Sequence, residues 1–600
     1  MGSPLGLGGL VMVAAFSGYW RQRQMDNPGA ARLSGTMILP RFLAPLALSI
    51  LAACAQMPAP SAASEPVEPF VIAANPLAAQ AGMDVLERGG NAADAAIAVQ
   101  AMLSLVEPQS SGIGGGAFLH YYDASSRELT VYDGREVAPA QATSTMFLDS
   151  DGEPIGFRDA VVSGRATGVP GAVGALALAH EEHGALPWSE LFGAAIRTAD
   201  EGFVVSPRLG RFLTIPFPQL SVPDADAYFS RPDGTRLQVG DRLRNPDYAA
   251  FLRRMAETGP DALYRGSTAA RIVERTRQGP LGGSMTMADL ANYRPIKRDP
   301  ICRGYRAYRV CAPPPPSSGV GFLQLLGLLE RTDIAARGPD DPQAWFLFAE
   351  ASRLMYADRD RYVGDVPTVP IEGLLDPAYL DSRAALIGDS AMAAPEAGVP
   401  EGATLPAADN TLEPAGTSHF IVRDAHGDVI SMTTTVESIF GTGRMVDGFF
   451  LNNQLTDFSF SPVNADGTQA PNAVAPGKRP RSSMIPLILL DSEGNFAGAI
   501  GSAGGNSILA YVGKSLVAAI DWGLPMQDAL ALPNLVARGS RIGGEVDDFN
   551  SAIVAGLAER GIQLEPGQGE DSGVHGVLIR EGDVDGGYDP RREGVVLVGE

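Results

Sequence analysis

The sequence predicts a layered α+β fold, in which strands gathered into hairpins are covered by helices on both sides. Three patterns support this prediction. Two helical segments stand near the start of the body, strand-turn-strand patterns occupy residues 417–435 and 484–500, and a helical pattern follows at 507–522. The body is long for one compact domain, yet no disordered linker interrupts it.

The first two elements are predicted helices over residues 76–88 and 91–105, separated by a Gly-Gly pair. Asn91 stands where the second helix begins, and an asparagine side chain at this position accepts a hydrogen bond from the free N–H groups of the first turn. Asp94 occupies the third position of the same turn. We therefore expect Asn91 to be the N-cap of the second helix.

Residues 300–303 and 307–310 are predicted strands of a short hairpin, and Cys302 and Cys311 flank its turn. In an exported protein these cysteines can form a disulfide across the hairpin, worth roughly 2–3 kcal/mol on the chain-entropy relation. The alternative is a pair of buried thiols, and the sequence leaves both open.

Two further hairpins are predicted in the second half of the chain. Residues 417–422 and 429–435 are predicted strands, because a strong turn signal at 424–428 joins them. Residues 484–490 and 496–500 form the second predicted pair, around a turn that contains Asp, Ser, Glu and Gly.

The first 54 residues are predicted to be a targeting segment. A short basic start precedes the apolar run 42–53, which suits a signal-peptide core and is too short to span a membrane. The ending Leu-Ala-Ala-Cys resembles a bacterial lipoprotein cleavage box with Cys54 as the lipidated residue; the alternative is a plain secretory signal. Residues 55–68 are predicted to be a flexible tether. We expect an exported, periplasmic protein that is lipid-anchored to a bacterial membrane through Cys54.

The composition argues against several kinds of partner. The 600-residue chain has a formal net charge of −23, and such an acidic surface repels nucleic acid. His180 and His183 do not have the His-Glu-x-x-His spacing, so we expect a solvated helix end before Gly184 and no metal site. The glycine run 112–116 follows a helix and leads into an apolar stretch, the wrong order for a phosphate-binding turn, so we expect no cofactor.

Gly416 and Thr417 are the most informative residues. A threonine inside a chain is a poor nucleophile, whereas the α-amino group of an N-terminal threonine, with a pKa of about 7.7–8.0, can accept the proton of its own hydroxyl. A chain that cut itself between Gly416 and Thr417 would create this pairing. Taken alone, Thr417 is better explained as an ordinary strand residue, and only the flanking residues favour the catalytic interpretation.

Further motifs follow one another along nearly the whole body. They occupy residues 75–78, 89–96, 112–116, 135–139, 168–171, 314–319, 416–420, 451–457, 478–484, 501–505 and 589–594. Through these motifs the chain resembles the γ-glutamyltranspeptidase (glutathione hydrolase) family of N-terminal-nucleophile hydrolases. The resemblance implies a four-layer αββα sandwich with the nucleophile at the start of a central strand. It also implies self-cleavage into a large subunit, 69–416, and a small catalytic subunit, 417–600.

The resemblance also assigns the catalytic groups. Thr417 supplies the nucleophilic hydroxyl and, through its freed amine, the base. Thr435 stands where the family hydrogen-bonds that hydroxyl, although β-propensity alone also explains a threonine there. Gly504 and Gly505 precede a predicted helix, so their N–H groups suit an oxyanion hole. A glycine pair that ends a strand is the alternative.

A γ-glutamyl group carries a carboxylate and an ammonium, and the resemblance places partners for both. Arg135 stands at the position that pairs with the α-carboxylate, where a guanidinium binds in a two-pronged way that lysine cannot. The hydroxyls of Ser482 and Ser483 are expected to donate to the same carboxylate. The residues expected around the ammonium are Glu437, Gln454 and Asp457. Singly, each is also explained as a turn or surface residue.

Two departures from better-known members concern specificity. Glu437 occupies a position that is Asn in some members and Glu in others, so we expect a more acidic ammonium pocket. The segment 459–477, a lid in some members, contains no Tyr, so we expect it to be shorter or gated differently.

The leading hypothesis is a γ-glutamyl hydrolase and transferase that cleaves the γ-amide of glutathione and related compounds through a γ-glutamyl-threonine intermediate, with water or an amino acid as acceptor. One alternative is an acylase of the same superfamily acting on a glutaryl group, as in a cephalosporin. That substrate has no ammonium, so the cluster around Asp457 argues against it. The other alternative is a non-catalytic binding lipoprotein, which the intact Thr417 and Thr435 disfavour.

Overall fold

A computed structural model describes residues 67–409, 411, 413–463, 467–567 and 572–599. The chain divides into two units, Met1–Ala63 and Ser64–Glu600, and the description below concerns the second. The predicted targeting segment with Cys54, and most of the predicted tether, lie outside the described residues. The last two tether residues form hydrogen bonds with the second unit. The N–H of Val67 donates to the carbonyl of Ala425, and the carbonyl of Glu68 accepts from Arg423.

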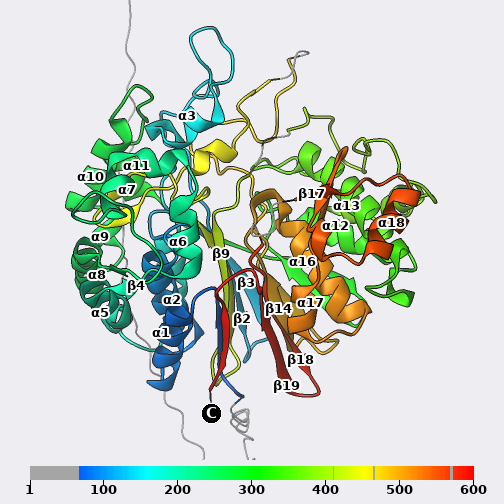
Figure 1. The fold of residues 1–600 in the computed structure, drawn as a ribbon, viewed down its shortest axis with the longest axis horizontal. Coiled ribbons are helices and arrows are strands. Elements are labelled where there is room, and N and C mark those ends of the chain that lie inside the picture. The colour runs from blue at the N-terminus through cyan, green and yellow to red at the C-terminus, as the bar shows by residue number, and fades with distance from the viewer. Residues whose placement is uncertain (1–66, 410, 412, 464–466, 568–571, 600) are drawn as a thin grey trace, which may run out of the picture. The chain divides into compact units, whose positions relative to one another are not determined.

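Two antiparallel sheets form the centre of this unit (Figure 1). The strands of the seven-stranded sheet, in spatial order, are β20 (Val595–Val598), β1 (Phe70–Ala73), β9 (Thr417–Arg423), β10 (Val429–Thr435), β2 (Gly116–Asp123), β3 (Glu128–Gly134) and β6 (Ile296–Arg298). Those of the six-stranded sheet are β19 (Asp583–Tyr588), β18 (His575–Arg580), β14 (Phe496–Gly501), β13 (Leu487–Leu490), β8 (Tyr308–Ala312) and β7 (Ile301–Tyr305).

Side chains alternate between the two faces of each sheet, as the two-residue period of a strand requires. In β9, Ile421 packs in a core that contains residues of both sheets, whereas its neighbours Phe420 and Val422 pack in the core under the first helices. In β13, Ile488 belongs to the shared core, and Leu489 to the core under the second set of helices. Both sheets are therefore buried on two faces.

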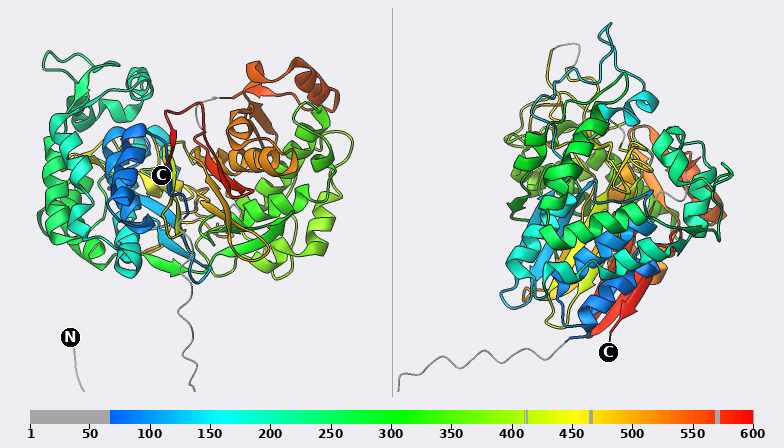
Figure 2. Two further views of the ribbon diagram at one scale, coloured as in Figure 1. Left: turned by 90° about the horizontal axis from the view of Figure 1, so that it is seen from below. Right: turned by 90° about the vertical axis from the view of Figure 1, so that its left-hand side faces the viewer.

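Helices cover the outer faces of both sheets, which completes an αββα sandwich (Figures 1 and 2). Against the seven-stranded sheet lie α1 (Pro76–Glu87), α2 (Ala92–Val106) and α4 (Ala172–His183), while α5 (Gly193–Glu201) packs on α2 and α8 (Pro246–Thr258) packs on α5. Against the six-stranded sheet lie α12 (Gly319–Leu329), α16 (Ile508–Leu516) and α17 (Met526–Ala531), while α13 (Pro342–Tyr362) packs on α12 and α18 (Ser551–Glu559) packs on α13. The predicted α+β sandwich is confirmed.

Shorter elements connect these layers. The helices are α3 (Phe157–Val161), α6 (Pro207–Thr214), α7 (Pro223–Tyr228), α9 (Asp261–Tyr264), α10 (Gly266–Arg277), α11 (Met287–Asn292), α14 (Ile371–Leu375) and α15 (Pro377–Ala384). The strands are β4 (Phe203–Val204), β5 (Arg242–Leu243), β11 (Met445–Val446), β12 (Phe449–Phe450), β15 (Leu535–Arg538), β16 (Arg541–Gly544) and β17 (Glu565–Pro566).

The structure agrees with the predicted start of α2. The side chain of Asn91 accepts from the N–H of Asp94, and the Asp94 carboxylate accepts from the N–H of Asn91, which makes a full capping box. The Cys302–Cys311 pair is joined by a disulfide with an S–S distance of 2.06 Å, across two residues that face each other in β7 and β8.

One predicted boundary is wrong, and one predicted helix changes type along its length. The strand predicted to begin at residue 484 begins at Leu487, because Pro486 has no N–H for the ladder and the preceding residues bind another segment: the hydroxyl of Ser317 donates to the carbonyl of Met484. The helix predicted over 507–522 is helical from Ile508 to Asp521, but after Leu516 it continues as a π-helical turn, Val517–Asp521, in which the N–H of Trp522 donates to the carbonyl of Val517, five residues earlier.

The expected solvated helix end before Gly184 is found in part: Glu181 and Glu182 are exposed, whereas His180 and His183 are partly buried. His183 stacks on Tyr121 with ring centroids 3.9 Å apart and hydrogen-bonds the hydroxyl of Tyr132. His180 hydrogen-bonds the carbonyl of Leu186 at 2.9 Å. The sheet beneath α4 carries these tyrosines, so the imidazole of His183 packs against the protein on one side.

Candidate active site

Thr417 is the first residue of β9, and it lies opposite Thr435, the last residue of β10, in the strand register. Both side chains are buried, and their hydroxyl oxygens are 3.3 Å apart. The chain is continuous through the bond between Gly416 and Thr417, so the nitrogen of Thr417 is an amide in this form. The site therefore represents the uncut precursor.

The hydrogen bonds around Thr435 determine where its single hydroxyl proton points. The Thr435 hydroxyl donates to the carbonyl oxygen of Gly416 at 2.7 Å and accepts from the N–H of Glu437 at 2.7 Å. Because a hydroxyl has one proton, Thr435 can only accept from the hydroxyl of Thr417. This arrangement places a donor on the Gly416 carbonyl and orients the Thr417 hydroxyl beside it.

One small cavity collects the predicted site residues. Its volume is about 20 Å³, and it is lined by Arg135, Glu413, Pro414, Thr417, Thr435, Glu437, Gln454, Asp457, Ser482, Ser483, Met484, Gly505 and Ile508. A cavity of this size holds no more than one water molecule. All the catalytic and binding residues named from the sequence line it except Gly504, which is the neighbour of Gly505. In the precursor the site residues are thus already brought together, but the cavity between them has no room for a substrate.

Glu413, four residues before Thr417, fills the side of the cavity where a substrate carboxylate is expected. Its carboxylate accepts from the N–H of Ser483 at 2.8 Å and pairs with Arg359 and Arg481. Burial alone would raise the pKa of Glu413, but the two guanidinium groups lower it to about 2. Glu413 is therefore ionised, and it holds an amide of the Ser482-Ser483 pair in the uncut chain.

The other side of the cavity is a cluster of buried acids. The Asp457 carboxylate accepts from Arg135 at 2.6 Å and from the amide of Gln454 at 2.6 Å, while Glu437 accepts from the amide of Asn453. Burial and the neighbouring Asp457 raise the pKa of Glu437 well above its ordinary value. Glu437 also has a positive φ of 82°, a conformation that non-glycine residues adopt at a cost and mostly at functional sites. Arg135 is thus paired with Asp457 in the precursor.

The glycine pair forms a tight loop against the residues that precede Thr417. Gly504 and Gly505 have φ values of 128° and 53°, and a Cβ on Gly505 would lie 2.0 Å from the carbonyl oxygen of Glu413. The N–H of Asn506 donates to this same carbonyl at 3.0 Å. Only glycine fits here, and the amides of the loop face the segment that self-cleavage would release.

The sequence analysis missed three charged residues of the site. Glu413 is the only charged residue in the stretch 411–416, directly before the proposed cut, and that isolation was an available signal. Arg481 lies inside the 478–484 motif but was not singled out. Arg359 lies near the end of α13, where no local pattern distinguishes it from an ordinary helix arginine; only packing brings it to Glu413.

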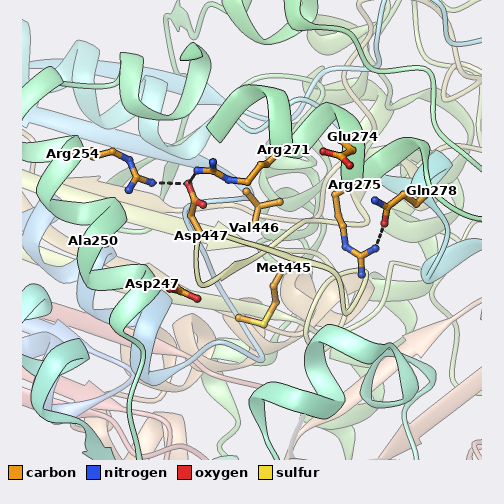
Figure 3. A pocket seen from close by; sticks show the side chains of 10 residues that line it. All are labelled: Asp247, Ala250, Arg254, Arg271, Glu274, Arg275, Gln278, Met445, Val446 and Asp447. Atoms are coloured by element: carbon orange, nitrogen blue, oxygen red, sulfur yellow. Dashed lines mark hydrogen bonds and ion pairs between the residues drawn. The ribbon is translucent and has the colours of Figure 1, made fainter. Parts of the chain in front are cut away.

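A separate cavity of about 440 Å³ lies between α8, α10 and β11 (Figure 3). Arg254 and Arg271 both pair with Asp447 at 2.6 Å, and Arg275 pairs with Asp224 at 2.7 Å. It shares no lining residue with the Thr417 cavity. Its guanidinium groups are paired with protein carboxylates, so this cavity does not indicate a second catalytic site.

The described part of the chain contains neither a candidate metal centre nor a candidate membrane span. No group of three or more His, Cys, Asp or Glu side chains there is arranged to hold a metal ion. None of the helices there has both the length and the apolar character that a membrane span requires.

An αββα sandwich has a threonine hydroxyl at the head of a central strand, beside a second hydroxyl and a loop of two positive-φ glycines. This arrangement defines the class: the chain is an N-terminal-nucleophile hydrolase. Within that class the chain belongs to the γ-glutamyltranspeptidase family, whose model, described as Gamma-glutamyltranspeptidase, matches residues 78–599.

Individual relatives include both hydrolases and acylases. The chain is 38% identical over 480 residues to the glutathione hydrolase proenzyme of Bacillus subtilis (strain 168), covering 78% of this chain and 80% of the relative. It is 36% identical over 502 residues to the acylase ACY 1 proenzyme of Pseudomonas sp. (strain SE83), covering 82% and 86%. The crystal structure of cephalosporin acylase from Bacillus halodurans superposes with a TM-score of 0.77 at 28% identity, covering 92% and 99%.

The acidic pair predicts an unusual dependence of stability on pH. A carboxyl whose pKa is raised in the folded protein keeps a proton that the unfolded chain has lost, so the free energy of unfolding falls as the pH rises above the ordinary value of 4.5. We expect Glu437→Gln, a neutral isostere, to remove this loss. Urea unfolding from about pH 5 to pH 9, with self-cleavage blocked by Thr417→Ala, measures it.

The stability of the Gln variant relative to its parent is expected to increase with pH. Glu401→Gln, at an exposed glutamate, is the matched control and should leave the pH profile unchanged. Parallel profiles for Glu437→Gln and its parent would show that Glu437 is ionised in the folded protein.

Proposed function

We propose that this γ-glutamyl hydrolase and transferase acts through Thr417 as its nucleophile, with the other residues of the cavity in the roles described below. Membership of the family and the similarity to proenzymes support the family's activity and a precursor form for this chain. The observation that carries the residue assignment is the single cavity at Thr417, into which segments far apart in the sequence bring Arg135, Asp457 and Gly505.

Self-cleavage is the first reaction that the geometry supports. The Thr417 hydroxyl attacks the carbonyl carbon of Gly416, the C–N bond to Thr417 breaks, and an ester forms while the departing nitrogen takes a proton. Water then hydrolyses the ester and leaves a free Thr417 amine. The hydrogen bond from Thr435 to the Gly416 oxygen supports this step, because the donor already lies where negative charge develops.

The same hydroxyl then serves the catalytic cycle. The free amine of Thr417 accepts the hydroxyl proton, the oxygen attacks the γ-carbonyl of the substrate, and the amine product leaves with that proton. Water or an acceptor amine resolves the γ-glutamyl ester. Loop amides at Gly504 and Gly505 stabilise the oxyanion in both steps.

Release of the cleaved segment makes the substrate groups available. When residues 413–416 leave, Ser483 loses its bond to Glu413, and Ser482, Ser483 and Arg135 can receive the α-carboxylate. Asp457, Gln454 and Glu437 then meet the substrate ammonium. An ammonium is a natural partner for two neighbouring acids that otherwise repel each other.

The experiment that tests this assignment is the intact mass of the purified protein under denaturing conditions. We expect two fragments, the smaller of which is Thr417–Glu600. A single chain that stays uncut on prolonged incubation would exclude the N-terminal-threonine mechanism. A cut at another bond would move the nucleophile away from Thr417.

An acylase of the same superfamily remains the second candidate, favoured by the relatives that carry that name. A glutaryl substrate has the terminal carboxylate but no ammonium, so it would give the buried acids Glu437 and Asp457 no cation besides Arg135. We therefore expect γ-glutamyl anilide to be cleaved with a much higher kcat/KM than glutaryl anilide. The reverse order would identify an acylase. Membership of a family of hydrolase proenzymes argues against the non-catalytic alternative.

The location of the protein is a separate proposal. The short apolar run and Cys54 support export to the periplasm with a lipid anchor. Metabolic labelling with a radioactive fatty acid tests it: label is expected on the large fragment and is expected to disappear in Cys54→Ser. An unlabelled protein released into the periplasm would indicate a plain secretory signal.

A further inference from the structure

Building on the proposed function, we infer that Arg592 is a positioning residue for the nucleophile. It holds the carbonyl of Thr417, and its charge favours the uncharged form of the amine that self-cleavage releases. Arg592 belongs to the 589–594 motif, which supplies none of the groups in the mechanism above. Its guanidinium nevertheless contacts the nucleophile, because Arg592 Nη1 donates to the carbonyl oxygen of Thr417 at 3.0 Å.

Arg592 takes the place of a strand neighbour at the head of β9. β1 pairs with β9 only over Phe420–Arg423, so within the described residues no strand pairs with this edge at the first three residues of β9. The carbonyl of Thr417 faces this edge, because the N–H of Asp424 donates across the hairpin to Asp428 and bonding directions alternate along an antiparallel pair. The guanidinium therefore binds an acceptor that β1 does not reach.

Arg592 is itself almost fully buried and held by other contacts. Its Nε donates to the carbonyl of Ser572 at 2.9 Å, and its Nη1 lies 3.8 Å from the carboxylate of Glu107. A Cβ on Gly573 would come within 2.6 Å of Nε, so the backbone approaches the guanidinium closely there. The cut makes Thr417 a chain end, and chain ends are poorly ordered unless they are tied down. Arg592 supplies such a tie.

The charge of Arg592 acts on the Thr417 amine because the two groups are close. Three covalent bonds link the nitrogen of Thr417 to its carbonyl oxygen, so this nitrogen lies within about 7 Å of Arg592 Nη1. A buried cation this close disfavours a second positive charge and lowers the pKa of an amine. The same cation acts on a neighbouring imidazole: burial first, and then Arg592, lower the pKa of His575 to about 4. The amine is thus kept available as a base near neutral pH.

The other charged groups around Thr417 are paired with one another or carry no charge. Burial raises the pKa of two carboxyl groups and lowers the pKa of two imidazoles, which are therefore neutral: Glu136, Glu437, His419 and His575. The ion pairs are Glu107 with Arg208, Asp457 with Arg135, Arg359 with Asp360 and Glu413, and Arg481 with Asp409 and Glu413. Glu593 is partly exposed and accepts from the N–H of Arg208. A change at Arg592 therefore alters the charge next to the amine and leaves these pairs in place.

The test is the pH dependence of kcat/KM for a γ-glutamyl anilide, whose acidic limb reports the base of the free enzyme. We expect Arg592→Gln to move this limb up by about one pH unit, because the amine then binds its proton more tightly. The plateau is expected to fall about tenfold, since the head of β9 is no longer held in place. Arg592→Lys keeps the charge and loses the fork, so its limb is expected to stay where the parent has it while its plateau falls.

A second variant is expected to shift the limb in the opposite direction, which a damaged fold does not explain. Glu107→Gln removes the carboxylate beside Arg592, so the amine meets a stronger positive charge and the limb is expected to move down. Arg309→Gln, at an exposed arginine of β8, is the charge-matched control and should leave the limb unchanged. Denaturing mass spectrometry counts the cut chains, so that each rate refers to cut molecules alone.

The inference is overturned if the limb of Arg592→Gln coincides with that of the parent, or if Arg592→Gln and Glu107→Gln move it in the same direction. Should Arg592→Gln stay uncut, an unshifted limb in Glu107→Gln or a raised limb in Arg592→Lys would overturn it equally. A parent protein that stays uncut, or that cleaves no γ-glutamyl anilide, would instead refute the proposed function.

Discussion

Thr417→Ala is expected to leave the chain as one uncut polypeptide and to lower γ-glutamyl hydrolysis by roughly 10⁴-fold or more. The variant lacks the hydroxyl that lies next to the Gly416 carbonyl, whose oxygen already accepts a hydrogen bond from Thr435. Without self-cleavage the amine is never released, so both the nucleophile and the base are lost together. Denaturing mass spectrometry and steady-state hydrolysis of a γ-glutamyl anilide measure the two effects.

Thr417→Ser is the matched control for this variant. It keeps the hydroxyl and the future amine, so we expect the same two fragments, formed more slowly because serine lacks the methyl group that restricts its rotamers. If Thr417→Ala still gave the same two fragments, with only the mass difference of the substituted residue, the mechanism would be contradicted. A Thr417→Ser protein that stays uncut would show that the methyl group is needed to hold the attacking geometry.

Arg135→Gln is expected to have the second largest effect, on stability and on catalysis. Arg135 donates to Asp457 at 2.6 Å and to the carbonyl of Arg481 at 2.6 Å, and it is almost fully buried. Removing the cation leaves a buried carboxylate without its partner, which costs roughly 3–5 kcal/mol. The mature enzyme also loses its two-pronged donor for the substrate carboxylate, so we expect kcat/KM to fall at least about a hundredfold.

A double variant separates the two effects. Arg135→Gln combined with Asp457→Asn removes both members of the Arg135–Asp457 ion pair, so most of the unfolding free energy lost at this pair is expected to return while the activity does not. Urea unfolding in the uncut Thr417→Ala background gives the stability, and hydrolysis kinetics of the cleaved proteins give the activity. An Arg135→Gln protein with normal KM and normal stability would remove Arg135 from the carboxylate subsite.

Local sequence patterns predicted most of the fold. The Asn91 cap of α2 and the hairpin of β9 and β10 depend on neighbours within a few residues, so the chain displays them directly. The errors arose where distant contacts override local propensity. Ser317, far away in the sequence, holds Met484 away from the sheet, so the strand begins later than its residues suggest.

The site was predicted unevenly for a similar reason. Thr417 and the glycine pair stand in motifs whose chemistry is recognisable from residue type and order. Glu413 and Arg359, however, became visible as a pair only when α13 and the segment before Thr417 were brought together. The sequence analysis expected Arg135 to face a substrate carboxylate, and in the uncut chain its partner is Asp457.

The identity of the family, the layered fold and the threonine mechanism could thus be inferred from the order of residues along the chain, because motifs and periodicities are local properties. The order of residues did not show which carboxylate pairs with which guanidinium. The contacts of Glu413 with Ser483 and of Arg135 with Asp457 are set by the packing of two sheets and their helices. Burial removes water as the competing partner there, so long-range geometry decides where each charge is satisfied.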